Sequence, residues 1–436
     1  MSPVRRAKRP PRSSATTVAT AFAAAAVTVA LLSAGSVTAT AQTSLAATPA
    51  PLAAGPPITA TAAPEPAAVQ TQRTYTFYVA AESDDIVEKI AFGPGGLRLI
   101  NSIEVGSWPT EIEGPHGLAI SPDGSYWYVS IAHGQPGPGG SIVKYATEDD
   151  VWLGEVEVGM FPATMAISPT IGLLYVVNFN LHGLPEPSSI SVVDPESMSE
   201  VGRVDVGVMP HGARMNRQGT RLYSVNMMDD VLVEVDTYRM AVTRQLGLSM
   251  HGRHKIDAMH EQHMAAGEGA GEHAGHEGAA APMAGMQMDM ANMVKPTWAT
   301  APTPQGKLYV AGNGAAKILE IDVESWEITR ELATPAGPYN LDVSADGTLL
   351  AATYKSSRAV GFWNLEKGEE VGRVETLRPI PHGIVISPDG RYAFATIEGI
   401  GGEPGSVEVY DLSTFERVAN LDIAKQAGGI AFWKID

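Results

Sequence analysis

The segment from Met250 to Met293, called the arm below, is built largely from side chains that bind metal ions. It holds six of the chain's eleven histidines and eight of its seventeen methionines. Imidazole suits Cu(II), zinc and nickel, whereas thioether sulfur is a soft ligand that selects Cu(I). The combination therefore favours copper in both oxidation states, with zinc or nickel as alternatives. The competing interpretation is a Gly/Ala-rich loop whose histidines are only solvated. The candidate ligands form three His-x-x-His pairs and a methionine run: His251, His254, His260, His263, His273, His276, Met283, Met286, Met288, Met290 and Met293.

The arm interrupts a sequence repeat. Ser-Pro-Asp-Gly occurs at 121–124 and 387–390, and degenerate copies end at Gly172, Gly219, Gly306 and Gly347. Successive terminal glycines are 48, 47, 87, 41 and 43 residues apart, and the long interval contains the arm. Each copy precedes a run rich in β-branched and aromatic residues. A repeat in the forties with short strands and turns at a fixed offset is typical of a β-propeller blade.

The strand runs predict an all-β fold, a seven-bladed β-propeller of four-stranded antiparallel blades over 73–436, with the His/Met-rich arm inserted as a loop between blades. Seven runs open at Tyr75, Tyr126, Leu174, Leu222, Leu308, Leu349 and Tyr392. The C-terminal residues 428–436 form an expected inner strand without partners, and the first run lacks an inner strand. Joining the two halves would complete one blade and close the ring, which removes exposed sheet edges.

This pattern resembles the YVTN/YncE-type seven-bladed propellers. The best-matching motifs are Tyr-Val-Val-Asn at 175–178 and Ser-Ile-Ser-Val-Val-Asp at 189–194. The resemblance covers residues 73–436 apart from the arm. It implies the propeller fold and leaves function open, because such propellers host enzymes, cofactor carriers and adhesive modules.

The remaining five histidines are expected at one end of the propeller. His116, His211 and His382 each lie in a Pro-His-Gly tripeptide at the start of an expected innermost strand. His133 and His182 follow second strands, which end on the same face. The arm joins a fourth strand to the next first strand and should emerge there too. Three inner imidazoles around the axis could form a tridentate metal site with open positions. The alternative is a turn whose histidine hydrogen-bonds a neighbouring loop.

Acidic residues divide between the two faces. Glu111, Glu113 and Glu398 are expected near the histidines, as partners of metal ligands, as acid/base groups, or as solvated loop acids. The acids of the Asp-Gly turns, Asp123, Asp346 and Asp389, are expected on the opposite face in structural roles. The sequence contains no nucleophile motif, phosphate-binding loop or covalent haem motif.

The N-terminus has the layout of a secretory signal peptide over 1–41, with a basic start, an uncharged apolar stretch and small residues before Ala41. Residues 42–72 are Ala/Pro/Thr-rich and are expected to be a disordered linker. Removing 1–41 takes away five basic residues and no acidic one, which changes the net charge from −18 to −23. Such acidity argues against a nucleic-acid partner. The chain has no cysteine, so thiolate sites and disulfides are excluded. No stable membrane span is expected after cleavage.

These observations predict an extracytoplasmic protein, secreted, periplasmic or bound to the cell envelope, that captures or delivers metal, foremost copper. The first alternative is a copper-dependent oxidoreductase with its centre at the channel mouth. The second is a non-enzymatic interaction module of the envelope, with the arm as an accessory. The expected partners are metal ions and a redox or envelope protein.

Overall fold

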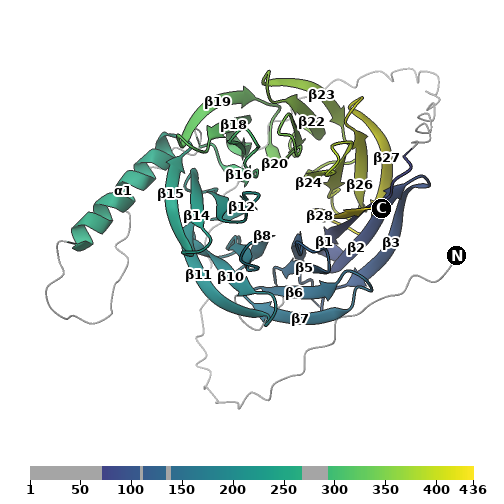
Figure 1. Cartoon of the computed structure of the whole chain (residues 1–436), viewed down its shortest axis with the longest axis horizontal. Coiled ribbons are helices and arrows are strands. Elements are labelled where there is room, and N and C mark those ends of the chain that lie inside the picture. Colours follow the sequence, from purple (N-terminus) through teal and green to yellow (C-terminus); the bar gives the residue numbers. More distant parts are fainter. Residues whose placement is uncertain (1–70, 109–110, 134–138, 268–292) are drawn as a thin grey trace, which may run out of the picture. The chain divides into compact units, whose positions relative to one another are not determined.

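The computed structural model describes residues 71–108, 111–133, 139–267 and 293–436, and only the backbone over 259–267. Within these residues, seven four-stranded antiparallel sheets surround a central axis (Figure 1). The predicted fold class and blade number are confirmed. The predicted signal peptide, 1–41, and most of the predicted linker lie outside the described residues.

The blades are given from inner to outer strand. Blade one contains β28 (Ala427–Ile435), β1 (Tyr75–Ala81), β2 (Ile86–Gly93) and β3 (Gly96–Glu104). Blade two contains β4 (Pro115–Ile120), β5 (Tyr126–Ile131), β6 (Ser141–Ala146) and β7 (Trp152–Glu157). Blade three contains β8 (Pro162–Ile167), β9 (Leu174–Asn178), β10 (Pro187–Asp194) and β11 (Ser199–Val208). Blade four contains β12 (Pro210–Met215), β13 (Arg221–Asn226), β14 (Val231–Asp236) and β15 (Ala241–Gly247).

The remaining blades follow the arm. Blade five contains β16 (Pro296–Ala299), β17 (Lys307–Gly312), β18 (Lys317–Asp322) and β19 (Glu327–Ala333). Blade six contains β20 (Pro338–Val343), β21 (Leu349–Tyr354), β22 (Ala359–Asn364) and β23 (Glu369–Glu375). Blade seven contains β24 (Pro381–Ile386), β25 (Tyr392–Ile397), β26 (Gly405–Asp411) and β27 (Glu416–Ile423). Helix α1 (Met250–Gly267) and two short 3-10 helices, Glu82–Asp84 and Asn313–Ala315, are also described.

The ring closes between the two ends of the propeller, as the sequence predicted. β28 pairs antiparallel with β1, and the register places Tyr75 opposite Ile435. The backbone of Thr74 exchanges two hydrogen bonds with Asp436, at 3.0 and 2.9 Å. Blade one is therefore complete only when both ends of the propeller sequence are present, and the closure removes two free sheet edges.

The Pro-His-Gly tripeptide has a physical reason at each of its positions. The residue before it adopts a left-handed backbone conformation in all three copies, at Gly114 (φ 67°), Met209 (φ 53°) and Ile380 (φ 66°). Proline then begins the inner strand, where its fixed φ is tolerated. A Cβ atom on Gly117 would lie 2.1 Å from the Ala163 carbonyl oxygen of the next blade. Glycine thus lets neighbouring inner strands approach at the axis.

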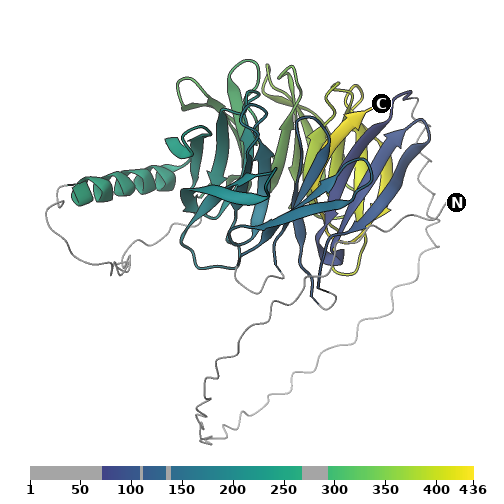
Figure 2. The same cartoon turned by 60° about the horizontal axis from the view of Figure 1, so that its bottom comes forward.

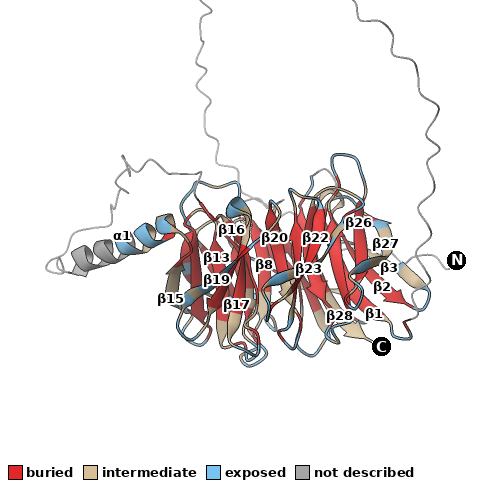
Figure 3. Ribbon diagram, turned by 90° about the horizontal axis from the view of Figure 1, so that it is seen from above, coloured by how far each residue is buried: buried red, intermediate tan, exposed pale blue. Residues whose placement is uncertain are grey.

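Most apolar burial lies within and between the blades, and the outer strands and loops are more exposed (Figure 3). At the closure, Tyr75 and Phe92 of blade one contact Tyr392 of blade seven, with ring centroids 5.2 and 5.0 Å apart. Both contacts are edge-to-face, which is a favoured aromatic geometry. This cluster stabilises the closed ring and so holds the inner strands in place.

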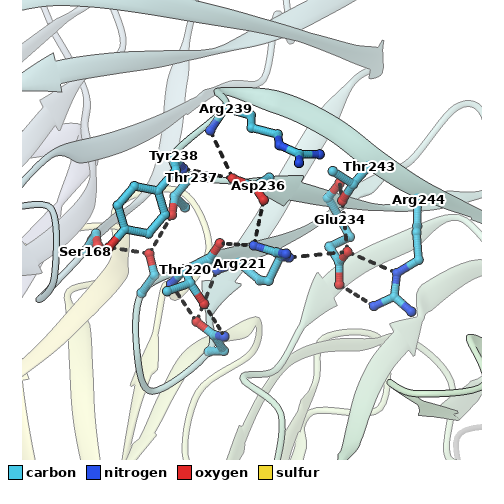
Figure 4. Close-up of polar contacts among 12 residues, drawn as sticks. Ser168, Thr220, Arg221, Glu234, Asp236, Thr237, Tyr238, Arg239, Thr243 and Arg244 are labelled. Carbon is cyan, nitrogen blue, oxygen red and sulfur yellow. Dashed lines mark hydrogen bonds and ion pairs between the residues drawn. The ribbon is translucent and has the colours of Figure 1, made fainter.

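Buried ion pairs join the strands within blade four (Figure 4). Arg221 of β13 lies 2.8 Å from the Asp236 carboxylate of β14. The neighbouring Glu234 carboxylate accepts hydrogen bonds from Arg244 of β15 and from the Thr243 hydroxyl. Burial alone would raise the pKa of Glu234, but these hydrogen bonds outweigh it and hold the pKa below its ordinary value. The network is structural and contains none of the candidate ligands.

The first part of the arm differs from the predicted loop, because Met250–Gly267 form the 18-residue helix α1 (Figure 2). Methionine, lysine, glutamate, glutamine and alanine in this stretch have high helix propensity. The helix also contacts β15, and Ile256 packs against the apolar core of blades three and four. No helix among the described ranges is long and apolar enough to cross a membrane.

The two ends of the arm meet at one carboxylate. Oδ2 of Asp230 accepts a hydrogen bond from the Ser249 hydroxyl at 2.7 Å and another from the Val294 backbone N–H at 2.9 Å. Its Oδ1 accepts the Lys295 N–H at 2.8 Å. The chain therefore leaves blade four and enters blade five at the same place, whatever lies between.

Candidate metal centre at the channel mouth

Three imidazole rings from three blades meet at the axis. His116 is the second residue of β4, His211 of β12 and His382 of β24. The ring centroid of His116 lies 6.1 Å from that of His211 and 5.6 Å from that of His382. Their exposed fractions are 9, 1 and 5%. These rings, with Trp298 and Arg214, line a small cavity of about 40 Å³.

Each ring has its Nδ1 directed at an outer partner. His116 Nδ1 contacts the Glu82 carboxylate in a short hydrogen bond. His211 Nδ1 donates to the Thr297 carbonyl oxygen at 2.8 Å. His382 Nδ1 lies 3.1 Å from Glu398 Oε1, an ion-pair distance without a well-aligned hydrogen bond. Such outer partners commonly orient histidines that bind metal through Nε2.

Tyr339 bridges two of the rings. Its hydroxyl lies 3.2 Å from His211 Nε2 and 3.2 Å from His382 Nε2. The Lys355 ammonium lies 3.9 Å from the centroid of the Tyr339 ring and donates to Glu398 Oε1 at 2.8 Å. A buried layer of tyrosine, lysine and glutamate therefore surrounds the histidines.

The electrostatics of the site favour neutral imidazoles at His211 and His382. Burial, followed by the charge of His116, lowers the pKa of His211 to about 3. Burial, followed by the charge of Lys355, lowers the pKa of His382 to about 4. Burial would raise the pKa of Glu398, but His382 and Lys355 outweigh it and lower the value to about 2. Neutral imidazoles beside ionised carboxylates suit a cation, since protonated histidine cannot bind metal.

Glu82 belongs to the same electrostatic group. Burial would raise its pKa, yet the charge of His116 and their hydrogen bond hold the pKa below its ordinary value. Among the described residues, no three His, Asp or Glu side chains already stand in a metal-holding arrangement. The Tyr339 hydroxyl occupies part of the space between His211 and His382, so an ion there would require small shifts.

The prediction from sequence did not identify most of the tyrosine, lysine and glutamate side chains beside the histidines, although the blade repeat places them at equivalent positions. Tyr339 follows Gly337-Pro338 at the position that His116 occupies in blade two. Glu82, Lys355 and Glu398 each come one residue after a second strand, β1, β21 and β25. Alignment of the blades residue by residue would have placed all of them near the axis. Of these, only Glu398 was predicted near the histidines.

His133 and His182 form a separate pair. Their ring centroids lie 5.1 Å apart. Phe161 lies between this pair and the inner histidines, with its ring 5.0 Å from His133 and 5.6 Å from His116. Burial and the neighbouring His182 lower the pKa of His133. The structure thus places both rings on the predicted face, beside the central cluster and outside it.

The arm residues are not brought to the centre among the described residues. His251 Nε2 lies 3.3 Å from the Met228 carbonyl oxygen, and the His254 side chain is exposed. Met293 is only 2% exposed and packs in the propeller. His260 and His263 lie on α1, where side chains are not described. The other predicted ligands, His273, His276, Met283, Met286, Met288 and Met290, fall outside the described residues.

The structure places the other acidic residues named in the sequence analysis in different surroundings. Glu113 is fully buried, and its carboxylate accepts the backbone N–H groups of Ser107 and Trp108, so it supports a loop. Glu111 is exposed. Asp123, Asp346 and Asp389 cap their turns by accepting hydrogen bonds from the serine hydroxyl two residues earlier, as predicted for structural residues.

Comparison with solved structures shows the fold. A chain of the hydrazine synthase of Kuenenia stuttgartiensis is similar with a TM-score of 0.54 and 17% identity, covering 74% of this chain and 91% of that one. A "putative 6-phosphogluconolactonase" from Bacteroides fragilis is similar with a TM-score of 0.60 and 12% identity, covering 85% and 100%. At these identities the likenesses carry the fold alone. No family model and no curated protein matches the chain. The resemblance to YVTN/YncE-type propellers therefore stays a prediction.

Proposed function

We propose that this propeller is a metal-binding protein that holds a transition-metal ion, foremost copper, at the central histidines and captures or delivers it with the help of the arm. One observation carries the proposal. Imidazoles of His116, His211 and His382 converge from three blades, and each has its Nδ1 directed at an outer partner. Nε2 is then the nitrogen that would bind an ion, which is the usual way in which histidine ligands are oriented. On His211 and His382 the ion would have to displace the Tyr339 hydroxyl, which contacts both Nε2 atoms.

The spacing of the rings supports this assignment. Metal–nitrogen bonds of about 2.0–2.1 Å place the ring centroids of ligands on one ion roughly 5 to 5.5 Å apart. The His116–His382 distance of 5.6 Å is close to this range, whereas the His116–His211 distance of 6.1 Å exceeds it by roughly 0.6 to 1.1 Å. Ring movements of this size would therefore be required. The carboxylates of Glu82 and Glu398 would balance the charge of a divalent cation in the buried site.

The composition of the arm favours a protein that captures or delivers metal ions over one that only stores an ion at the central histidines. Its pairs of histidines suit Cu(II), and its methionines suit Cu(I). On α1, His251/His254 and His260/His263 are spaced i,i+3, which brings the two members of each pair to neighbouring positions on the helix. The acidic chain also attracts cations in general. We place this activity outside the cytoplasm, on the basis of the N-terminal signal-like layout.

The test is metal content of the full-length protein and of three single variants, His116→Ala, His211→Ala and His382→Ala. After dialysis against a weak chelator, wild type should retain one ion more than each variant, and double variants should lose little more, because the ligands act as a unit. His254→Ala, in the exposed part of the arm, is the matched control and should keep the tightly held ion.

Two results would contradict the proposal. Equal retention of metal by wild type and all three variants would remove the central site. Identical Cu(II) affinity of the arm at pH 7.5 and 5 would exclude ligation by its histidines, because binding to an exposed histidine weakens as the ring is protonated. Full-length protein without bound metal would instead favour the non-enzymatic interaction module.

A further inference from the structure

Four large apolar side chains are exposed at the channel mouth of blades one to three. Trp108 and Ile112, in the loop between β3 and β4, are 40 and 60% exposed. Leu181 and Leu184, in the loop between β9 and β10, are 40 and 71% exposed. Single exposed apolar side chains are ordinary, whereas a group of them with a polar rim marks an interaction site.

The two loops belong to one contiguous surface. The backbone N–H of His133 donates to the Glu113 carbonyl oxygen at 2.8 Å, which joins His133 to the first loop. The His133 ring centroid lies 5.1 Å from that of His182, which stands between Leu181 and Leu184 in the second loop. The histidine pair therefore connects the two groups of apolar side chains. The apolar mouth surface is the name used below for Trp108, Ile112, Leu181 and Leu184 together with His133 and His182.

Two carboxylates fix the backbone of the first loop. The buried Glu113 carboxylate accepts the backbone N–H groups of Ser107 and Trp108. The Asp85 carboxylate accepts the N–H groups of Glu113 and Gly114, both at 2.9 Å. The loop is thus held in one shape while the Trp108 side chain stays exposed. Such preorganisation reduces the conformational entropy that is lost when a partner binds.

The second loop is fixed by its own hydrogen bonds. Asn180 has a left-handed backbone (φ 57°), and its Nδ2 donates to the Leu184 carbonyl oxygen at 3.1 Å. The backbone N–H of Glu186 donates to the same oxygen at 2.8 Å. Both loops therefore expose apolar side chains from a backbone that is already ordered.

The formal charges in the loops on this side of the mouth are all negative. Six acidic residues and no lysine or arginine occur in the mouth loops of blades one to three, which are 82–85, 105–114, 132–140, 158–161 and 179–186. Two of the acids, Glu111 and Glu186, are exposed in the same loops as the apolar side chains, whereas Asp84 is paired with Lys425 at 3.1 Å. An apolar surface with acidic edges is complementary to apolar side chains surrounded by lysine and arginine.

We propose that the apolar mouth surface docks a protein partner whose contact face carries lysine or arginine around an exposed apolar side chain. This inference goes beyond the proposed function and requires no metal ion. A second copy of this chain is disfavoured, because a symmetric contact would bring the same acids, Glu111 and Glu186, against each other. An anionic lipid surface would also repel these acids. Trp108 belongs to a residue type that is enriched at the energetic centre of protein interfaces.

The experiment selects peptides from a random library displayed on phage, with chelator-treated full-length protein as the target. Selected peptides should carry lysine or arginine on both sides of an aromatic or aliphatic residue. Their affinity, measured by fluorescence polarisation, should fall at least about tenfold in Leu184→Asp and in Trp108→Ala. Glu186→Lys should also weaken binding and reduce its dependence on salt. Val201→Asp, at an exposed position on the outer strand β11, is the matched control and should bind as wild type does.

Each contrary outcome has a defined meaning. A library that yields no peptide, or peptides that bind Leu184→Asp as tightly as wild type, overturns the proposal. Peptides without basic residues overturn the stated chemistry of the partner. Wild-type dimers that Leu184→Asp dissociates in sedimentation would assign the surface to a second copy instead, and phosphatidylglycerol vesicles that bind wild type but not Leu184→Asp would assign it to a membrane. Because Leu184 is 71% exposed, its replacement should leave the fold intact. Failure of metal binding would leave these outcomes unchanged.

Discussion

Replacing His382 with glutamine should remove part of the acid sensitivity of the metal-free propeller. Burial and the Lys355 charge lower the pKa of His382 to about 4, whereas histidine in an unfolded chain titrates near about 6.5. Between these values the unfolded chain binds a proton that the native state excludes. Stability from this group is therefore complete above about pH 6.5 and is lost as the pH falls toward 4.

The magnitude follows from the difference in bound protons. One proton corresponds to a slope of about 1.4 kcal/mol per pH unit. Integrated from pH 7.5 to pH 5, the loss for His382 is about 2 kcal/mol. The His382→Gln variant does not experience this loss. The difference in unfolding free energy between wild type and variant should thus shrink by about 2 kcal/mol over this range.

The assay is urea-induced unfolding, followed by tryptophan fluorescence at pH 7.5, 6.5 and 5 in chelator-treated buffer. Taking the difference between wild type and variant cancels the titrating groups that do not interact with His382. His254→Gln, at an exposed position, is the control and should follow wild type at each pH. A difference for His382→Gln that stays constant between pH 7.5 and 5 would refute a buried neutral imidazole.

Three further outcomes are expected. Deleting 250–293 should lower the thermal unfolding midpoint in metal-free buffer only modestly, through the lost packing of Ile256 and Met293, because both ends of the arm meet at Asp230. A collapse in stability would show that the rest of the arm also belongs to the core. Arg244→Ala should destabilise by about 3 kcal/mol, because the buried Glu234 carboxylate loses its closest charged partner and keeps only Arg221 at 3.7 Å and the Thr243 hydroxyl. Arg203→Ala, from an exposed pair, should cost under about 1 kcal/mol. Equal urea midpoints for these two variants would contradict the assignment. Burial raises the pKa of Glu88 to about 7, so ionisation of this group at high pH destabilises the native state. Glu88→Gln should therefore raise the free energy of unfolding by about 3 kcal/mol at pH 8 and leave it unchanged at pH 4. No gain in urea unfolding at pH 8 would refute this.

The repeat allowed the blades and their closure to be predicted from sequence. Turn residues at a fixed offset mark each blade, and the incomplete ends at Tyr75 and 428–436 required each other. Helix α1 differs from the predicted loop, because glycine and alanine at loop density and the lack of strand alternation favour a loop over the whole arm. The helix follows from local propensity and from contacts with β15, and those contacts depend on the tertiary structure.

The part of the candidate site that the sequence predicted is mainly its histidines. His116, His211 and His382 were found because the same tripeptide recurs. Tyr339 occupies the equivalent position but carries a different side chain, and Lys355 lies on the neighbouring second strand. Their contact with the histidines depends on packing between blades, which no single repeat specifies. A search for equivalent positions rather than for equal residues would have found them.

Small residues at the inner positions are as much a part of the centre as its ligands. A Cβ atom on Gly428 of blade one would lie 3.0 Å from His382 Nδ1 and 3.0 Å from Glu82 Oε1. Gly428→Ala should therefore displace Glu82, the partner that orients His116, and weaken central copper binding by about 10- to 100-fold, as loss of such partners does. Gly402→Ala, where an added Cβ would meet no atom within 4 Å, is the matched control and should bind as wild type does. The measurement is competition with a chelator of known affinity, and equal affinities of the two variants would show that the orientation of His116 does not depend on this contact. A propeller repeat places equivalent residues at equal distance from the axis, so three histidines, one tyrosine and a few small residues in different blades are enough to build a site.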